Sequence, residues 1–435
     1  MAAPSTATAA RGAPRHTVVG PPPGPRVLSQ GETVTSTQLT GAESPLDVLP
    51  ERWRALRDAG PVTYDEERRQ WHVVDHQGVS AVLSDPATYS SDMTPIAPTQ
   101  EDFEAFRQGN FVGMDPPEHR KLRTLVSQAF TPRVVHGLAP RIEAVCARLL
   151  DGVADRDRFD LVDTLAYPLP IIVIAELLGV PAEDHRLFQE WAATLFGGDQ
   201  LGDSLDMADL ERALEAIAPT VREMNGYVLD HIRHRRAHPG DDLTSRLLTA
   251  EVDGTRLRDE EIVGFVALLL VAGHITTTAL LGNAMVTFDR HPGTLTALRE
   301  DPGRVPDAVE EVLRWLPPFP ELGRRTTRPV VLGGHDIPAD TLLMVHLGAA
   351  NRDPSRFTSP DVFDAARDPN PHLTFGHGIH FCFGAPLARL EARIALQMMM
   401  ERFPSLAVPS YDDVTYQNPA VIVGVRHLPV AVTRP

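Results

Sequence analysis

The sequence is short of cysteine: its 435 residues contain two, Cys146 and Cys382. Two cysteines cannot build the disulfide framework of a small secreted protein, so the predicted location is the reducing cytoplasm. A long apolar run is also missing. The most membrane-like segment, residues 262–273, is shorter than the roughly 18 residues that a membrane-spanning helix requires. We therefore predict a buried central helix there and no membrane partner.

Basic residues are scarce relative to acidic ones. The chain has 41 Lys and Arg against 58 Asp and Glu, which gives a formal net charge of -17. This balance argues against nucleic acid as a partner, because phosphate backbones are bound by clustered positive charge. The apolar fraction of 43% is ordinary for a soluble globular protein, and a chain of this length can bury a substantial core.

The chain divides into a tail and one domain. Residues 1–44 are rich in Ala and Pro without a signal-peptide h-region, so we predict a disordered tail. No linker or repeat interrupts residues 45–435, which predicts a single domain. Helical periodicity dominates it, with short strand-like runs near both ends, so the predicted fold class is mainly α. The main predicted helices cover residues 50–59, 205–236, 259–290, 306–316 and 391–403, and the predicted strands lie at 62–64, 71–74 and between 330 and 346.

The loop around Cys382 is the most informative segment. It contains glycines, which permit a left-handed backbone and the close approach of a flat ligand, and aromatic rings, which would exclude water. These residues are Gly376, Gly378, Gly384, Phe375, Phe381 and Phe383. A helical pattern begins directly after the loop, and N–H groups at a helix start stabilise a thiolate. A protected single thiolate indicates a ligand of haem iron rather than a nucleophile that must meet substrate.

Two other interpretations of this loop stay open. Cys382 could join His372, His377 and His380 in a zinc site, although structural zinc sites usually have paired ligands at regular spacing. It could also be an ordinary buried thiol, the usual state of a lone cysteine. Because zinc would leave the glycines and phenylalanines unexplained, we favour haem.

Cations are available for the two carboxylates that a haem carries. His119 and Arg123 lie four residues apart on one face of a predicted helix. Arg324 follows a proline-rich turn, and His380 stands two residues before the cysteine. No acidic residue occurs from position 369 to 390, in a chain otherwise rich in acids. That local absence suits an anionic cofactor.

A candidate buried network precedes the loop. Glu311 and Arg314 stand at i, i+3 in a predicted helix, and Arg367 is the nearest further cation. An arginine fork can bind a carboxylate through two hydrogen bonds. A helical pair of this kind is nevertheless most often exposed and of little energy.

Small residues interrupt the predicted central helix. Ala272 and Gly273 would make room for a ligand against the helix backbone, and Thr276 offers a hydroxyl group. Simple helix packing explains these small residues equally well.

Together these residues resemble the cytochrome P450 superfamily, of the soluble actinobacterial type, over residues 45–435. The pattern Phe-Gly-x-Gly-x-His-x-Cys-x-Gly-x-x-Leu-Ala-Arg carries the resemblance. It implies the cytochrome P450 fold, a large helical domain with small sheets near the N-terminal part and the C-terminus. It also implies a haem-thiolate monooxygenase that contains haem b, without zinc, bound flavin or bound NAD(P)H, and inserts one oxygen atom of O2 into a hydrophobic small molecule.

The resemblance assigns roles to single residues. Cys382 is the axial ligand of haem iron, and Thr276 assists proton delivery to O2. The implied cofactor-binding residues are His119, Arg123, Ala272, Gly273, Arg324, Phe375, Gly376, His380, Cys382 and Gly384, and the implied structural network is Glu311, Arg314 and Arg367. One departure stands out: an acid usually precedes the threonine, and here the position is Ile275. We hypothesise that Thr276, ordered water and a substrate hydroxyl relay protons without a carboxylate, with His274 as a weaker substitute.

The substrate and the partners follow from the same resemblance. The predicted pocket is apolar, which suggests a secondary metabolite of polyketide or macrolide type, as in antibiotic biosynthesis. Its predicted lining is Leu268, Ala272, Pro318, Phe319, Val421 and Ile422, with an irregular cap over residues 92–112 and a lid over 187–210. A ferredoxin and its ferredoxin reductase are the expected electron donors, docking near Arg120, Lys121, Arg389 and Arg393. A peroxide-driven oxidase and a non-catalytic haem sensor are the alternatives.

Overall fold

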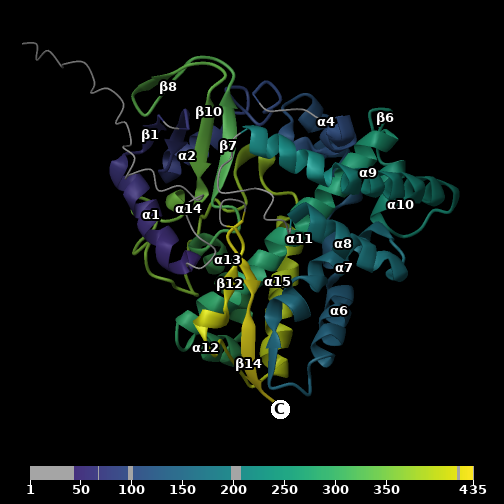
Figure 1. The fold of residues 1–435 in the computed structure, drawn as a ribbon, viewed down its shortest axis with the longest axis vertical. Helices are drawn as coiled ribbons and strands as arrows, with labels where there is room; N and C mark the ends of the chain where they lie inside the picture. Colours follow the sequence, from purple (N-terminus) through teal and green to yellow (C-terminus); the bar gives the residue numbers. More distant parts are fainter. Residues whose placement is uncertain (1–43, 67, 97–100, 197–206, 419–421, 435) are drawn as a thin grey trace, which may run out of the picture.

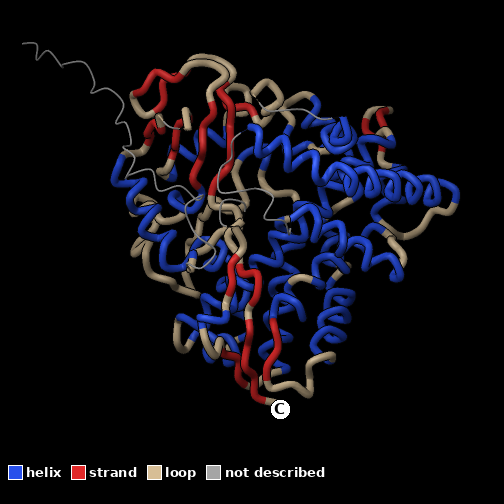
Figure 2. The backbone as a smooth tube through the Cα atoms, in the orientation of Figure 1, coloured by secondary structure: helices blue, strands red, loops and turns tan. Residues whose placement is uncertain are grey.

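The protein is described by a computed structural model, which covers residues 44–66, 68–96, 101–196, 207–418 and 422–434. Figure 1 shows the chain from its N-terminal part to its C-terminus, and Figure 2 shows that helices make up most of it, with strands in several separate regions. The predicted tail, residues 1–44, lies outside the described residues except for Ser44. The prediction of its disorder therefore stays a prediction.

A single long helix, α11 (Asp259–Arg290), organises the helical part. Three acidic residues occupy its first turn, where they complement the positive end of the helix dipole. Beyond that turn its side chains are buried on nearly every face, as expected of a helix enclosed by others. It is the one described helix long and apolar enough to cross a membrane, and 67% of its most apolar stretch is buried inside the fold. It is therefore explained as a core helix.

Other helices surround α11 (Figure 1). Those that pack on it include α3 (Glu104–Gly109), α7 (Pro168–Leu178), α8 (His185–Phe196), α9 (Met207–Ala237), α13 (Val305–Trp315) and α15 (Ala385–Arg402). The remaining α-helices are α1 (Pro45–Ala59), α2 (His76–Ser84), α4 (Glu118–Ala129), α5 (Pro132–His136), α6 (Ala139–Asp151), α10 (Leu243–Thr249), α12 (Thr294–Glu300) and α14 (Leu347–Ala350). Short 3-10 or π turns are η2 (Glu101–Phe103), η3 (Phe111–Gly113), η4 (Val162–Ala166), η5 (Ala182–Asp184), η6 (Pro302–Arg304), η7 (Gly378–His380) and η8 (Tyr411–Asp413).

Within the described residues, five small sheets complete the fold. The largest has the order β1-β2-β10-β7-β3, and β10 is parallel to β2 but antiparallel to β7. Its strands are β1 (Val62–Asp65), β2 (Gln70–Val73), β3 (Tyr89–Ser90), β7 (Glu321–Thr326) and β10 (Leu342–His346). A second sheet joins β11 (Ser405–Ala407), β14 (Pro429–Thr433) and β4 (Arg158–Asp160), and the hairpins pair β12 (Thr415–Tyr416) with β13 (Val425–His427), β5 (Glu251–Val252) with β6 (Thr255–Arg256), and β8 (Val330–Leu332) with β9 (His335–Ile337).

Sequence periodicity was sufficient to predict the long helices but not every short element. The central helix has the predicted bounds, and α9 runs through Pro219 to Ala237, close to the predicted end. Helix α1 begins five positions earlier than predicted, at Pro45, because a proline is accommodated at the first turn. Strand β7 was not predicted, since its sequence Glu-Leu-Gly-Arg-Arg-Thr does not alternate between apolar and polar residues. The prediction of an irregular segment over residues 92–112 is confirmed for 92–96 but wrong from residue 101 on, where η2, α3 and η3 form.

Candidate active site

The loop before α15 holds Cys382 in a closed backbone turn. The Cys382 N–H donates to the carbonyl oxygen of Phe375 at 2.8 Å, which brings the two ends of the loop together. Gly376 and Gly378 have φ values of 74° and 69°, the left-handed region that glycine adopts without strain. A Cβ on Gly378 would also lie 2.6 Å from the carbonyl oxygen of Leu83. These glycines therefore serve the turn and its close approach to α2.

The sulfur of Cys382 lies in surroundings that favour a metal-bound thiolate over a free one. Burial raises the pKa of the thiol above its ordinary value, although backbone N–H groups of Gly384 and Ala385 and the guanidinium groups of Arg123 and Arg389 act to lower it. Without a further cation the free thiol would be protonated at neutral pH. A coordinated metal deprotonates a thiol outright, and the N–H groups would then stabilise the thiolate.

Four buried or half-buried basic side chains gather beside this loop. The rings of His119 and His380 lie 4.4 Å apart between centroids, and both nitrogens of His380 lack a hydrogen-bond partner among the described residues. Burial, followed by the charges of His119, Arg324 and Arg123, lowers the pKa of His380 to about 3. Burial likewise lowers the pKa of Arg324. The imidazoles are therefore neutral at neutral pH, and an anionic group bound here would favour their protonated forms and offset the repulsion between the two guanidinium groups.

The middle of α11 is less completely buried than the turns around it, with accessible surface on Val271 and on four residues that share another side of the helix. Leu269, Ala272, Gly273 and Thr276 retain accessible surface, and they repeat at i, i+3, i+4 and i+7. This spacing places them on one side of the helix. The hydroxyl of Thr276 donates to the carbonyl oxygen of Ala272 at 2.7 Å, so its lone pairs stay free to accept hydrogen bonds. We call these four residues the open face of α11.

The neighbours of Thr276 point elsewhere. Ile275 is buried in a small apolar cluster with Ala279 and Ile422. His274 is buried against Tyr167, at 4.5 Å between ring centroids, and burial lowers its pKa to about 4. A neutral imidazole packed in the core is a poor proton donor at neutral pH, so the structure does not support His274 as the substitute acid.

The cysteine loop and the open face adjoin one another. Phe383, next to the cysteine, lies 6.0 Å from Phe265 of α11 and 5.7 Å from Phe111 of η3 between ring centroids. Phe375 and Phe383 also pack against the main hydrophobic core, which includes much of α11. Among the described residues the four basic side chains form no ion pair, although Asp115 is near enough that its charge acts to raise the pKa of Arg324 and His119. The site suits haem b: the sulfur matches the iron, the basic side chains match the two carboxylates, and the small residues of α11 leave room for the ring.

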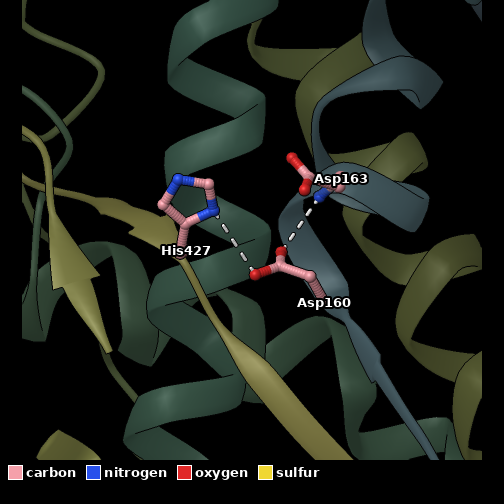
Figure 3. A group of neighbouring side chains, drawn as sticks. All are labelled: Asp160, Asp163 and His427. Carbon is pink, nitrogen blue, oxygen red and sulfur yellow. Dashed lines mark hydrogen bonds and ion pairs between the residues drawn. The ribbon is translucent and has the colours of Figure 1, made fainter. Parts of the chain in front are cut away.

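The zinc interpretation lacks support from the geometry. His372, one of its proposed ligands, donates from Nε2 to the carboxylate of Glu310 at 3.1 Å instead. Among the described residues, the one group of at least three possible ligands with atoms within 4.8 Å of one another is Asp160, Asp163 and His427 (Figure 3). Asp160 accepts hydrogen bonds from the backbone N–H groups of Val162, Asp163 and Leu428, so its oxygens already cap η4 and hold β14. That group is explained as a structural cap.

The predicted network of Glu311, Arg314 and Arg367 is formed. The carboxylate of Glu311 accepts two hydrogen bonds from Arg314 at 2.8 Å and contacts Nε of Arg367 at 3.1 and 3.2 Å. Glu311 and Arg314 are completely buried. Asn370 also donates to Glu311, at 3.1 Å, which sequence reasoning missed because an isolated asparagine carries no periodic signal. The network ties α13 to the segment that leads into the cysteine loop.

A second ion pair, which was not predicted, holds the other side of the loop. Arg389 of α15 donates to both oxygens of Glu310 at 2.6 and 2.7 Å, and its guanidinium lies 4.4 Å from the ring centroid of Phe375. Burial alone would raise the pKa of Glu310, but the hydrogen bonds of Arg389 and His372 lower it to about 2. The adjacency of Glu310 to the network was the signal that could have found it.

The predicted substrate-pocket residues are placed as follows. Val423 N–H donates to the carbonyl oxygen of Pro318 at 2.8 Å, which joins the proline-rich turn to the segment after residue 421. Phe319 is 37% exposed, whereas Leu268, Pro318 and Ile422 are buried. Val421 lies outside the described residues. The lining therefore remains a prediction.

Comparisons with known proteins agree with this geometry. A family model for cytochrome P450 matches residues 62–430. Erythromycin C-12 hydroxylase of Saccharopolyspora erythraea is 45% identical over 381 residues, which cover 86% of this chain and 92% of that protein. Cyclomarin C epoxidase CymV of Salinispora arenicola is 44% identical, covering 87% and 95%. The solved structure of open cytochrome P450 EryK from S. erythraea aligns with a TM-score of 0.81 at 44% identity, covering 90% of this chain and 98% of that one.

Proposed function

Because this chain belongs to the cytochrome P450 family, it is a haem-thiolate monooxygenase, and we propose that it oxidises a bulky, hydrophobic secondary metabolite of macrolide or polyketide type. The predictions of the family, the mainly α cytochrome P450 fold, haem b and monooxygenase chemistry are confirmed. The site residues, the substrate and the electron donors belong to the proposal.

The observation that carries the proposal is the open face of α11, the helix whose Phe265 contacts Phe383 next to the cysteine. Its accessible side chains are apolar or small except for the hydroxyl of Thr276. Pockets of this composition bind apolar ligands and orient them through a few polar groups. Relatives that share more than two fifths of their residues with this chain include a hydroxylase named for erythromycin and an epoxidase named for cyclomarin C, both large natural products. Hydroxylation and epoxidation are therefore the two reactions proposed.

The residues of the cysteine side would hold the cofactor. When bound, haem with a thiolate ligand activates O2 and transfers one oxygen atom to the substrate. Cys382 would supply the thiolate, with the N–H groups of Gly384 and Ala385 directed at its sulfur. His119, Arg123, Arg324 and His380 would neutralise the two carboxylates. The rings of Phe375, Phe381 and Phe383 would limit the access of water to the sulfur.

Thr276 would position the proton donor. Its own O–H is engaged with the carbonyl of Ala272, so the oxygen lone pairs can accept a hydrogen bond from a water or from a substrate hydroxyl. Ile275 offers no proton and His274 is neutral and buried, so the donor that reaches Thr276 must be water or substrate. A substrate with hydroxyl groups, as macrolides have, fits this requirement.

The test uses the purified protein and a panel of natural products. The reduced protein should give the red-shifted carbon monoxide band of a thiolate-ligated haem, and the Cys382→Ser variant should lose it. Macrolides and cyclic peptides are then screened for the shift of the oxidised haem band that follows displacement of iron-bound water. Binders are incubated with a ferredoxin system, and products one oxygen atom heavier are sought by mass spectrometry. Normal carbon monoxide binding with no response to any macrolide or other bulky natural product would contradict the substrate proposal.

A ferredoxin with its reductase is proposed as the electron donor. The structure divides the four predicted docking cations into two kinds. Lys121 is paired with Glu261 at 2.8 Å and Arg389 with Glu310, whereas the guanidinium groups of Arg120 and Arg393 have no partner among the described residues. Arg120 is also exposed, so it is the better candidate for contact with an acidic protein.

We expect Arg120→Glu to slow reduction by ferredoxin several-fold at low salt and to flatten its salt dependence, since rim charges act mainly on the association rate. Stopped-flow reduction measures this, with Arg256→Glu, an exposed arginine already paired with Glu251, as the control. Lys121 is the single lysine of the chain, so carbodiimide cross-linking to ferredoxin carboxylates reports on this position and the N-terminal amine alone. Equal reduction rates for the Arg120 variant, the control and the unmodified protein would exclude Arg120 from the docking face.

A further inference from the structure

The short helix α3 lies directly on α11, at backbone contact. A Cβ atom on Gly264 of α11 would stand 2.1 Å from the carbonyl oxygen of Ala105 and 2.6 Å from the amide nitrogen of Gly109. A Cβ on Gly109 would stand 2.2 Å from the amide nitrogen of Phe265 and 2.4 Å from the carbonyl oxygen of Glu261. All four obstructing atoms belong to the backbone, so no side-chain rotation can relieve the overlap. The two helices can touch in this way only while both positions are glycine.

A second, independent contact holds the other side of this segment. Asp102, just before α3, accepts a hydrogen bond from Arg222 of α9 at 2.6 Å. Its backbone carbonyl accepts from Asn225, also of α9, at 3.4 Å. The segment from η2 to α3 is therefore clamped between α9 and α11. This contrasts with the irregular cap that the sequence predicted.

The clamped helix borders the open face of α11. Leu269 and Ala272, the first two residues of that face, follow Gly264 by five and eight positions, or roughly 8 and 12 Å along the axis of an α-helix. Phe103 and Phe106, on the clamped segment, keep accessible apolar surface. Helix α3 thus contacts α11 just N-terminal to the face where substrate is proposed to lie, and we call it the α3 wall.

We propose that Gly109 and Gly264 are specificity-determining positions, because their backbone contact fixes how far the α3 wall stands from the open face and so which sizes of ligand fit against it. The inference rests on the proposed function, in which a bulky ligand occupies that face. An added methyl group must move α3 outward by roughly 1.3 Å to take the closest contact from 2.1 Å to the ordinary 3.4 Å, which forfeits about half of the dispersion energy between the wall and a ligand. A small ligand that binds at the iron without touching α3 should not respond.

The experiment compares Gly264→Ala with a matched control in the same kind of helix. Gly226 of α9 has no atom within 4 Å of an added Cβ, so Gly226→Ala changes helix propensity without displacing a neighbour. The holoproteins are titrated with imidazole as the small probe and clotrimazole as the bulky one, and binding is followed by the shift of the haem band. Hydrogen exchange of the α3 amides gives a readout that does not depend on activity.

For Gly264→Ala we expect clotrimazole affinity to fall roughly tenfold while imidazole affinity changes by less than about twofold, as a displaced wall predicts. The α3 amides should exchange faster in this variant, and Gly226→Ala should change neither measurement. A ratio of the two affinities that equals that of the unmodified protein, or the same change in both variants, would overturn the inference, since a merely structural role lowers stability without altering size selectivity.

A second variant decides the question if Gly264→Ala does not fold. Asp102→Asn removes the ion pair to Arg222 at the partly exposed edge of the clamp and leaves the α11 backbone unchanged. It should raise exchange in α3 and lower clotrimazole affinity by a few-fold with imidazole unaffected, and an unchanged affinity ratio overturns the proposal. Failure of the unmodified protein to show the thiolate carbon monoxide band would instead count against the proposed function itself.

Discussion

The cysteine side and the α3 side of the site are fixed by opposite means. Around the cysteine, buried charges meet in matched sets, as when Glu311 binds two arginines. On the other side, α3 and α11 touch through Gly109 and Gly264, which contribute no side chain at all. The comparison teaches that a buried ion pair requires particular partner residues, whereas a backbone contact between two helices requires only that side chains be absent there.

The two kinds of contact also fail differently. Removing one partner of a buried ion pair leaves an uncompensated charge in a low dielectric, which costs more than the intact pair contributes. Adding a methyl group to a backbone contact displaces one element and leaves the rest of the core intact. Substitutions on the cysteine side should therefore affect whether the protein folds, and substitutions on the α3 side should affect what it binds.

The largest effect is expected for Glu311→Gln. Arg314 and Arg367 would lose their common counter-charge inside the fold, and we expect a loss of about 3–5 kcal/mol in the free energy of unfolding. Thermal unfolding and the yield of haem-containing protein measure it, with the exposed Glu300→Gln as the control. A Glu311→Gln protein as stable as this control would break the comparison, because the network would then be dispensable.

A charge introduced at Ile275 of α11 should lower the free energy of unfolding by less than Glu311→Gln does. Ile275→Glu would place a carboxylate among Ala279 and Ile422 without a partner there, and we expect a loss of about 2–4 kcal/mol. Product formed per reductant consumed should not improve, since the side chain points away from the open face. Ile275→Val, which deletes a single methylene, should cost only about 0.5–1.5 kcal/mol. Better coupling in a stable Glu variant would show that the missing acid is a handicap after all.

The smallest effect concerns Glu391 of α15, a buried acid without a hydrogen-bond partner among the described residues. Burial raises the pKa of Glu391 from 4.5 to about 8. The folded state then holds a proton that the unfolded state loses between these values, so the stability contributed at low pH is lost as the pH rises from about 4.5 to 8. Glu391→Gln should remove this dependence and raise stability by about 1–3 kcal/mol at pH 8, with little change near pH 5.

Denaturant unfolding at both pH values tests this, and the exposed Glu143→Gln of the adjoining helix α6 serves as the control. An unchanged pH slope in the Glu391 variant would mean that the carboxyl group is ionised in the fold. That result would distinguish the two buried acids, since Glu311 binds two arginines whereas Glu391 has no cationic partner among the described residues.

The match between sequence and structure follows the same division. The central helix could be predicted to its end residues because a fully apolar run bounded by acids has one stable placement. The Glu311, Arg314 and Arg367 network could be predicted only through the resemblance to the family, because a helical Glu-x-x-Arg pair is by itself most often exposed. By contrast, α3 was missed because six residues carry too little periodicity, and β7 because its two neighbouring strands, rather than its own pattern, make it extended.

By itself the sequence determined the family and the central helix, because the cysteine-loop pattern and a long apolar segment flanked by acids are each specific signals. The tertiary structure alone decided that Lys121 and Arg389 are engaged in internal pairs, that Ile275 and His274 face away from Thr276, and that α3 rests on α11. These facts depend on which surfaces meet after the chain has folded. Two glycines make a backbone contact only when the fold packs their helices together, and no local sequence pattern predicts that packing.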